Sequence, residues 1–122
     1  MKDLMELAKK ARENAYIPYS KFAVGAALLA SSGKVYTGAN IENASYGLTL
    51  CAERTAIVKA VSEGEREFSC IAIVADTSEP VLPCGACLQV MAEFHIDKLI
   101  LGNLITTREV KLSELLPHNF TL

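Results

Sequence analysis

Residues 70–101 read CIAIVADTSEPVLPCGACLQVMAEFHIDKLIL, and this stretch decides the fold class. Its first segment, Cys70–Ala75, is entirely apolar, as expected of a strand that is buried on both faces of a sheet. Pro83 then opens an apolar helix over Cys84–Phe94, and Asp97–Leu101 follows as a second strand. A strand, a helix and a strand in succession predict an α/β layer structure with at least one parallel pair of strands.

The rest of the chain continues this alternation of helices and strands. Apolar residues recur at helical spacing near the N-terminus until Pro18, and two apolar runs flank the turn sequence Ser31-Ser32-Gly33-Lys34. Residues 104–110 are compatible with either a strand or a loop. No repeat or linker divides the chain, so we expect a single domain over residues 1–122. The other expected elements are a helix over residues 4–15, strands over 22–30 and 35–41, a helix over 49–62 and a helical turn over 112–116.

Composition excludes several classes of protein. With 51% hydrophobic and 21% charged residues, the chain has the composition of a globular protein. Its net charge of −2 disfavours nucleic acid as a partner. No apolar run approaches the ~18 residues of a membrane span, so no membrane contact is expected. The first residues lack the apolar core of a secretory signal, which favours a cytoplasmic location. A mean hydropathy of +0.25 is high for a small monomer and suggests burial against further copies of the chain.

The four cysteines are the unusual feature of this composition. Their even number is compatible with two disulfides, but in a reducing cytosol cysteines more often serve metal binding or catalysis. Cys70 lies within an apolar strand, where a packing role is expected. Cys51, Cys84 and Cys87 instead fall at predicted helix starts, where unpaired N–H groups and the helix dipole lower the pKa of a thiol.

These three cysteines and two neighbouring charged residues form a candidate catalytic site. Cys84 and Cys87 share a helix face because they are three residues apart, and three thiolates with one open position are typical of catalytic zinc. Glu53, two residues after Cys51, can reach a water on the metal, whose pKa zinc lowers to about 7, and can carry its proton. Arg54 lies on the same helix face as Cys51 and could balance the thiolate charge.

Two other interpretations of the cysteines remain at this point. Cys84 and Cys87 could form a redox dithiol, although this leaves the Cys51-Ala52-Glu53 motif unexplained. A purely structural zinc site would need a fourth protein ligand, and His95 and His118 fall outside any ligand spacing.

The motifs together resemble those of small cytidine deaminases of the homotetrameric, three-cysteine type. The resemblance runs through nearly the whole chain and includes the three-cysteine form of a zinc-deaminase signature with a non-ligand glutamate. It rests on YIPYSKFAVGAAL (residues 16–28), GANIENASY (38–46), CAERTA (51–56), PCGAC (83–87) and ELLP (114–117).

The resemblance implies a fold and a reaction. The fold is a three-layer α/β/α structure with a five-stranded mixed sheet and helices on both faces. The reaction is the hydrolytic deamination of cytidine and 2′-deoxycytidine to uridine and 2′-deoxyuridine, with release of ammonia, in pyrimidine salvage. One Zn²⁺ per chain is held by Cys51, Cys84 and Cys87, and Glu53 is the proton shuttle.

The resemblance also implies how the substrate is bound. Asn40 and Glu42 hydrogen-bond the ribose 3′-hydroxyl, Phe22 packs on the pyrimidine ring, and the N–H of Ala52 meets the ring carbonyl. A homotetramer with sites shared between subunits is implied, in which the following residues reach a neighbouring site: Ala44, Tyr46 and Phe120. Leu88 stands where the family usually has Arg, which puts the electrostatic tuning of the site in doubt and leaves Arg54 as the nearest charge partner.

Related substrates are the remaining alternatives. Deamination of another cytosine compound, such as the nucleoside antibiotic blasticidin S, is one, but the sequence Asn40-Ile41-Glu42-Asn43 favours a plain ribose or deoxyribose. An editing deaminase that acts on nucleic acid is disfavoured because the chain has no basic stripe.

Overall fold

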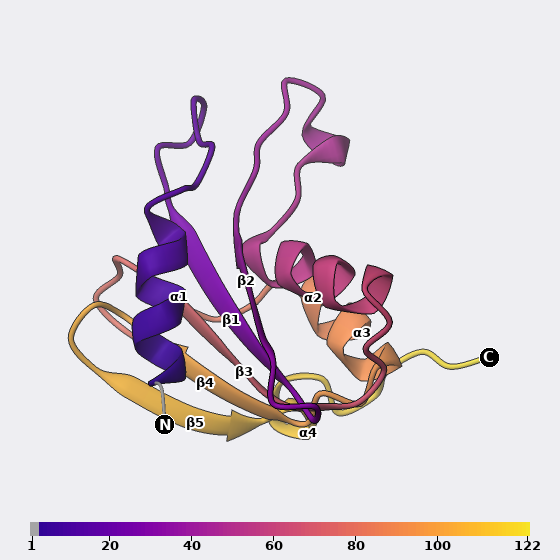
Figure 1. The fold of residues 1–122 in the computed structure, drawn as a ribbon. Helices are drawn as coiled ribbons and strands as arrows, with labels where there is room; N and C mark the ends of the chain where they lie inside the picture. Colours follow the sequence, from indigo (N-terminus) through magenta and orange to yellow (C-terminus); the bar gives the residue numbers. More distant parts are fainter. Residues whose placement is uncertain (1–2) are drawn as a thin grey trace.

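The computed structural model describes residues 3–122, and Figure 1 shows the course of the chain. Met1 and Lys2, part of the N-terminal stretch considered for a signal sequence, lie outside the described residues. A short 3₁₀ turn over Tyr46–Leu48 supplements the main elements. These are α1 (Leu4–Arg12), β1 (Val24–Ala30), β2 (Val35–Ala39), α2 (Ala52–Ser62), β3 (Phe68–Ala75), α3 (Gly85–Glu93), β4 (Lys98–Gly102), β5 (Thr107–Lys111) and α4 (Leu112–Leu115).

Within residues 3–122 the strands form one five-stranded mixed sheet in the order β2-β1-β3-β4-β5. Strands β1 and β2 form the expected antiparallel hairpin, and β3 and β4 are parallel, as the strand–helix–strand pattern predicts. The remaining neighbours, β1 with β3 and β4 with β5, are antiparallel. Because Thr107–Lys111 pairs with β4, the segment that could have been strand or loop is a strand over most of its length.

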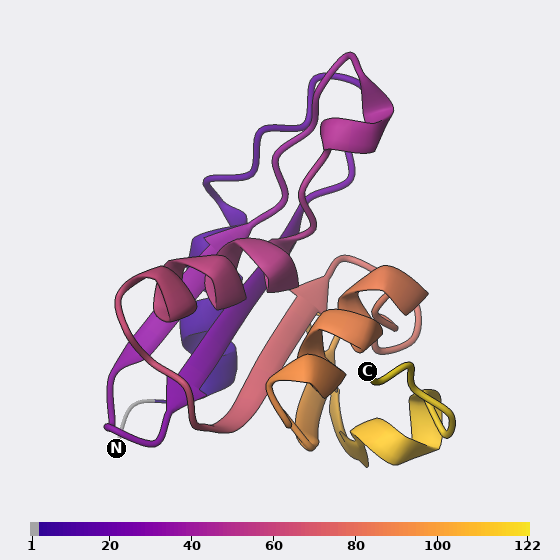
Figure 2. The same ribbon diagram turned by 90° about the vertical axis from the view of Figure 1, so that its right-hand side faces the viewer.

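Helices cover both faces of this sheet, which confirms the three-layer arrangement (Figures 1 and 2). The position of β3 in the middle of the sheet explains why Cys70–Ala75 is apolar throughout, because successive side chains point to opposite faces and both faces are covered. Ile71 and Ile73 belong to the large core beneath α2 and α3, whereas Ala72 and Val74 belong to the small core beneath α1. Among residues 3–122, no helix is long and apolar enough to cross a membrane.

Two glycines allow the helices to approach the sheet closely. A Cβ atom on Gly25 would lie 2.0 Å from the carbonyl oxygen of Ala8 in α1. A Cβ atom on Gly38 would lie 2.5 Å from the carbonyl oxygen of Ala52, the first residue of α2. Since no side chain fits at either point, Gly38 allows the first turn of α2, next to Cys51, to lie directly against β2.

Helices α1 and α2 are each three residues shorter than the sequence pattern predicts, and the chain next to both shortened ends pairs with residues 40–42. The N-terminal helix was expected to residue 15 but ends at Arg12, and the N–H of Tyr16 donates to the carbonyl of Asn40 at 3.0 Å. Helix α2 was expected from residue 49 but begins at Ala52, because Leu50 exchanges two backbone hydrogen bonds of 2.9 Å with Ile41.

Candidate active site

The three cysteines predicted to bind zinc lie together where two helices begin. Cys51 is the N-cap of α2, Cys84 is the N-cap of α3, and Cys87 lies in the first turn of α3. The Sγ atom of Cys84 is 3.8 Å from that of Cys51 and 3.4 Å from that of Cys87, and all three lie within 4.8 Å of one another. Zn–S bonds of about 2.3 Å at tetrahedral angles separate sulfurs by roughly 3.8 Å. The three thiols therefore fit one Zn²⁺ per chain.

The electrostatics of the thiols favour a bound cation. Hydrogen bonds to its sulfur, first from Cys87 and then from Arg54 and Cys84, lower the pKa of Cys51 to about 5. Cys87 is fully buried, and its pKa is raised because it shares its proton with the Cys51 sulfur and has no access to water. Three negative sulfurs at this spacing repel one another, so a divalent cation is needed for all of them to ionise.

Glu53 is buried beside the thiols, in the first turn of α2. Its exposed fraction is 4%, and with Asn103 it is one of two polar or charged residues classed as buried in the part of the chain that the structure describes. Burial raises the pKa of Glu53 to about 7, and the nearby charge of Cys51 adds to the effect. A carboxyl group with a pKa near the working pH is suited both to take up a proton and to release it.

Arg54 is the cation in contact with the thiols. Its Nη2 atom donates to the Sγ atom of Cys51 at 3.5 Å and to the carbonyl oxygen of Thr49 at 3.4 Å. The hydrogen bond to Cys51 raises the pKa of Arg54 further above its ordinary value. Its Nε atom is buried and has no hydrogen-bond partner among residues 3–122. Leu88 is buried in the core and contributes no charge.

Asn40 and Glu42, predicted to bind a ribose, already make hydrogen bonds within the chain. The side-chain oxygen of Asn40 accepts from the N–H of Val24 at 2.9 Å, and its amide donates to the carbonyl of Phe22 at 2.8 Å. The Glu42 carboxylate accepts hydrogen bonds from the backbone N–H and from the hydroxyl of Ser20. The hydrogen bond from the hydroxyl lowers the pKa of Glu42. Both side chains therefore hold the segment that carries Phe22, and each keeps capacity for at least one further hydrogen bond.

The loops that contain these residues, 13–23 and 40–51, project together beyond the sheet (Figures 1 and 2). We call them the paired loops. The rings of Tyr19 and Tyr46 meet edge to face with their centroids 6.4 Å apart. Glu42 lines a cavity of about 370 Å³ with Tyr19, Ser20, Tyr46 and Thr49. Predicted contact residues in the paired loops stay accessible to a partner, since Phe22 is 41% and Tyr46 77% exposed, and Ala44 is exposed too.

Phe120 lies apart from the paired loops, in the C-terminal tail of residues 117–122, and is 69% exposed. Its backbone is held by Gln89 of α3, whose amide donates to the carbonyl of Phe120 at 2.9 Å and accepts from its N–H at 3.0 Å. The chain therefore places the tail against α3.

Comparison with known proteins identifies the family. Residues 1–103 match the family model described as the cytidine and deoxycytidylate deaminase zinc-binding region. The chain belongs to this deaminase family. The matched range contains the three cysteines, Glu53 and the paired loops, but not Phe120.

The likeness to individual deaminases extends over almost the whole chain. A cytidine deaminase from Halalkalibacterium halodurans is 61% identical over 121 residues, which are 97% of this chain and 92% of that protein. The crystal structure of a cytidine deaminase from Burkholderia pseudomallei has a TM-score of 0.93 at 51% identity and covers 96% of each chain. A cytidine deaminase structure from Mycobacterium tuberculosis has a TM-score of 0.84 at 42% identity and covers 98% of this chain and 95% of that chain. The fold is therefore that of a cytidine deaminase.

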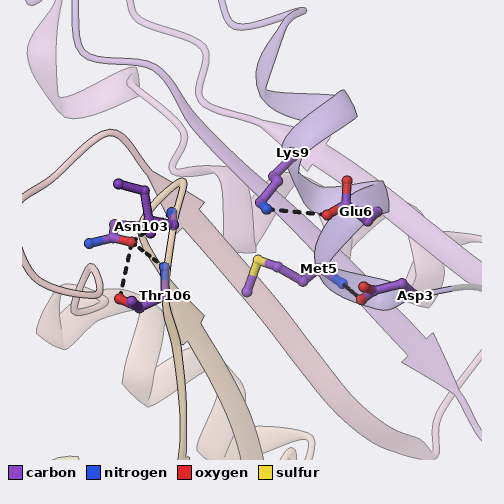
Figure 3. A network of polar contacts seen from close by, with 7 residues as sticks. Asp3, Met5, Glu6, Lys9, Asn103 and Thr106 are labelled. Carbon is purple, nitrogen blue, oxygen red and sulfur yellow. Dashed lines mark hydrogen bonds and ion pairs between the residues drawn. The ribbon is translucent and has the colours of Figure 1, made fainter.

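Asn103 is a buried polar residue that the sequence analysis missed, and it contacts the loop that leads from β3 towards Cys84. Its side-chain oxygen accepts from the Thr106 N–H at 2.6 Å and the Thr106 hydroxyl at 3.1 Å (Figure 3), and its amide donates to the carbonyl of Ser78 at 3.0 Å. Met5 of α1 lies beside the same turn in Figure 3. Asn103 thus anchors the loop that leads from β3 to Cys84, and an asparagine just after an apolar strand is the turn signal that could have indicated it.

Proposed function

We propose that this chain is a zinc-dependent cytidine deaminase that converts cytidine and 2′-deoxycytidine to uridine and 2′-deoxyuridine with release of ammonia. The observation that carries the proposal is the cluster of three Sγ atoms within 4.8 Å of one another, next to a carboxyl group that is only 4% exposed. The 61% identity to a cytidine deaminase supports the choice of substrate.

The residues divide the chemistry between them. Cys51, Cys84 and Cys87 would hold zinc, which when bound supplies a Lewis acid that acidifies a water molecule. Glu53 accepts a proton from the attacking water and delivers it to the ring nitrogen N3 as C4 gains the oxygen. It then carries the second proton of that water to the amino group, so that the C4–N bond breaks and ammonia leaves. Its pKa near 7 suits both steps. Arg54 offsets the negative charge of the thiolates through its contact with Cys51.

Substrate recognition is assigned to the paired loops and the start of α2. The N–H of Ala52 faces the ring carbonyl, Phe22 packs on the ring, and Asn40 and Glu42 bind the ribose 3′-hydroxyl. The Glu42 carboxylate would repel a phosphate group on the 3′-oxygen, so a free 3′-hydroxyl is favoured there. The following residues contribute to the site of a neighbouring subunit: Ala44, Tyr46 and Phe120.

A homotetramer, a cytoplasmic location and a role in pyrimidine salvage complete the proposal. The paired loops support the oligomer, because they expose large apolar side chains that a lone subunit leaves in water. These are Tyr16, Tyr19, Phe22, Ile41, Tyr46 and Leu48, each 41% exposed or more. The chain acts as a single domain, residues 1–122.

One experiment tests the proposed reaction. Purified protein is assayed by ultraviolet absorbance on cytidine, 2′-deoxycytidine, cytosine and deoxycytidylate, with zinc measured in the same sample. We expect turnover of the two nucleosides, weak turnover of the free base and the nucleotide, and zinc equimolar with the chain. Zinc-loaded protein that releases no ammonia from either nucleoside would overturn the proposal.

A further inference from the structure

The C-terminal tail is held by a single side chain. Gln89 makes two hydrogen bonds to the backbone of Phe120, of 2.9 Å and 3.0 Å, in the way that a neighbouring strand would. Among residues 3–122, no other hydrogen bond joins residues 117–122 to the rest of the chain. The position of the tail therefore depends on Gln89.

The tail is not held by burial of its aromatic ring. Phe120 is 69% exposed, and a cavity of about 550 Å³ remains between the tail and α3. Fixing a backbone costs conformational entropy, which packing of the ring in its own subunit does not offset here. An aromatic ring that is carried on an anchored backbone but left in water is suited to contact another molecule.

The geometry of α3 directs the tail away from the subunit's own thiols. Successive residues of a helix are about 100° apart, so Gln89 lies roughly 200° around the axis from Cys87. Cys87 faces the buried thiol cluster, and Gln89 therefore faces away from it. In Figure 1 the tail leaves the body of the molecule beyond α3. The Phe120 ring is thus better placed to serve a second copy of the chain than its own site.

We propose that Gln89 is a positioning residue that fixes the C-terminal tail so that Phe120 completes the nucleoside site of a second copy of this chain. The inference rests on the proposed deaminase function and adds the residue that holds Phe120 in place. It connects the thiol cluster to the tail through α3, because the helix whose start carries Cys84 and Cys87 also carries the anchor for the neighbour's site.

The anchor is tested first without reference to activity. Hydrogen exchange of the Phe120 amide is measured in the zinc-loaded protein, in Gln89→Met and in Glu93→Gln. Methionine matches the size of glutamine but makes neither hydrogen bond, and Glu93 is an exposed residue on the same helix. We expect protection in the wild type and in Glu93→Gln, and exchange at least tenfold faster in Gln89→Met. Equal exchange in the wild type and Gln89→Met would overturn the anchor.

The consequence for the substrate is tested by kinetics. We expect Gln89→Met to raise KM for cytidine about tenfold with kcat changed less than about twofold, since a loosened binding residue must be ordered by the substrate. In a Phe120→Ala background the same substitution should change KM by less than about twofold. A Gln89→Met effect that is equally large without the Phe120 ring, or that appears as loss of zinc or kcat, would show a general structural role and overturn the proposal.

Mixed oligomers test whether Phe120 acts on a second copy. Gln89→Met chains are assembled with Glu53→Gln chains, which lack the proton carrier but keep an intact tail. We expect KM of the mixed sample to return towards the wild-type value, because the inactive chains supply a fixed Phe120 to active sites. An unchanged KM would mean that the tail acts within its own subunit. Failure of the wild-type protein to deaminate cytidine would instead contradict the proposed function, while the exchange measurement would still decide the anchor.

Discussion

The thiol cluster at the starts of α2 and α3 differs from the paired loops in how it is built. In the cluster, close backbone packing sets the geometry, and its central groups, Cys87 and Glu53, are buried. In the paired loops, side chains such as Asn40 and Glu42 hold the backbone, and the aromatic residues remain exposed. The comparison teaches that the proposed chemistry would lie in the buried part of one chain, whereas the proposed recognition would lie in a part that stays accessible to a second chain.

The largest effect expected in the thiol cluster comes from Glu53→Gln. Loss of the proton carrier should lower kcat for cytidine about 10²–10⁴-fold, while bound zinc stays at the wild-type ratio because Glu53 is not a ligand. Steady-state kinetics and metal analysis of one preparation measure both. The control is Glu63→Gln at the exposed C-terminal end of the same helix. A near-normal rate in Glu53→Gln would remove the basis for placing the chemistry in the buried cluster.

Arg54→Gln should have the next largest effect, on metal binding. The substitution removes the cation that contacts the Cys51 sulfur, and we expect zinc affinity to fall about 10–100-fold. Competition with a chelator of known affinity measures this, and Arg108→Gln on the exposed surface of β5 is the control. Unchanged zinc affinity would mean that the two helix N-termini balance the thiolates without Arg54.

Glu42→Gln tests the paired loops and should affect binding rather than turnover. Loss of a charged acceptor for the ribose hydroxyl should raise KM for cytidine about tenfold, with little change in kcat. The same substitution should matter less for 3′-deoxycytidine, which lacks the hydroxyl. If both substrates weaken equally, Glu42 acts only by holding Ser20 and not by binding the sugar.

The smallest expected effect is a dependence of stability on acid that arises in the paired loops. The hydrogen bond from Ser20 lowers the pKa of Glu42 below its ordinary value of 4.5. The ionised carboxylate therefore stabilises the fold above pH 4.5, and this contribution is lost as the pH falls through the lowered pKa. Urea unfolding at several pH values compares the wild type with Glu42→Gln. The difference between them should shrink on acidification, and a difference that stays constant with pH would contradict this assignment.

The two regions also differ in how much of them is evident from the sequence. The α/β class, the hairpin and the β3–β4 parallel pair follow from local periodicity, because each residue's burial depends on its position in a strand or helix. The cysteines are also recognisable from the local sequence, since Cys51, Cys84 and Cys87 mark helix starts in the sequence as they do in the structure.

The paired loops and the tail are less predictable because their hydrogen bonds join residues far apart in the chain. Nothing near Asn40 in sequence indicates that its side chain bonds to Val24 and Phe22. The pairing of Leu50 with Ile41 likewise removes three residues from the start of the expected helix. The pair formed by Gln89 and Phe120 spans 31 residues, and no local pattern encodes such a contact.

The spacing of the thiols along the chain has a consequence for folding. Cys51 and Cys84 are 33 residues apart, and β3 lies between them, so a metal ion bound by both acts as a cross-link. By the loop-entropy relation used for disulfides, closing a segment of that length restricts the unfolded chain by roughly 4 kcal/mol. Unfolding with and without a chelator would measure this contribution. A cell short of zinc would then lose the protein through degradation as well as its activity, because the same ion supports catalysis and cross-links the folded chain.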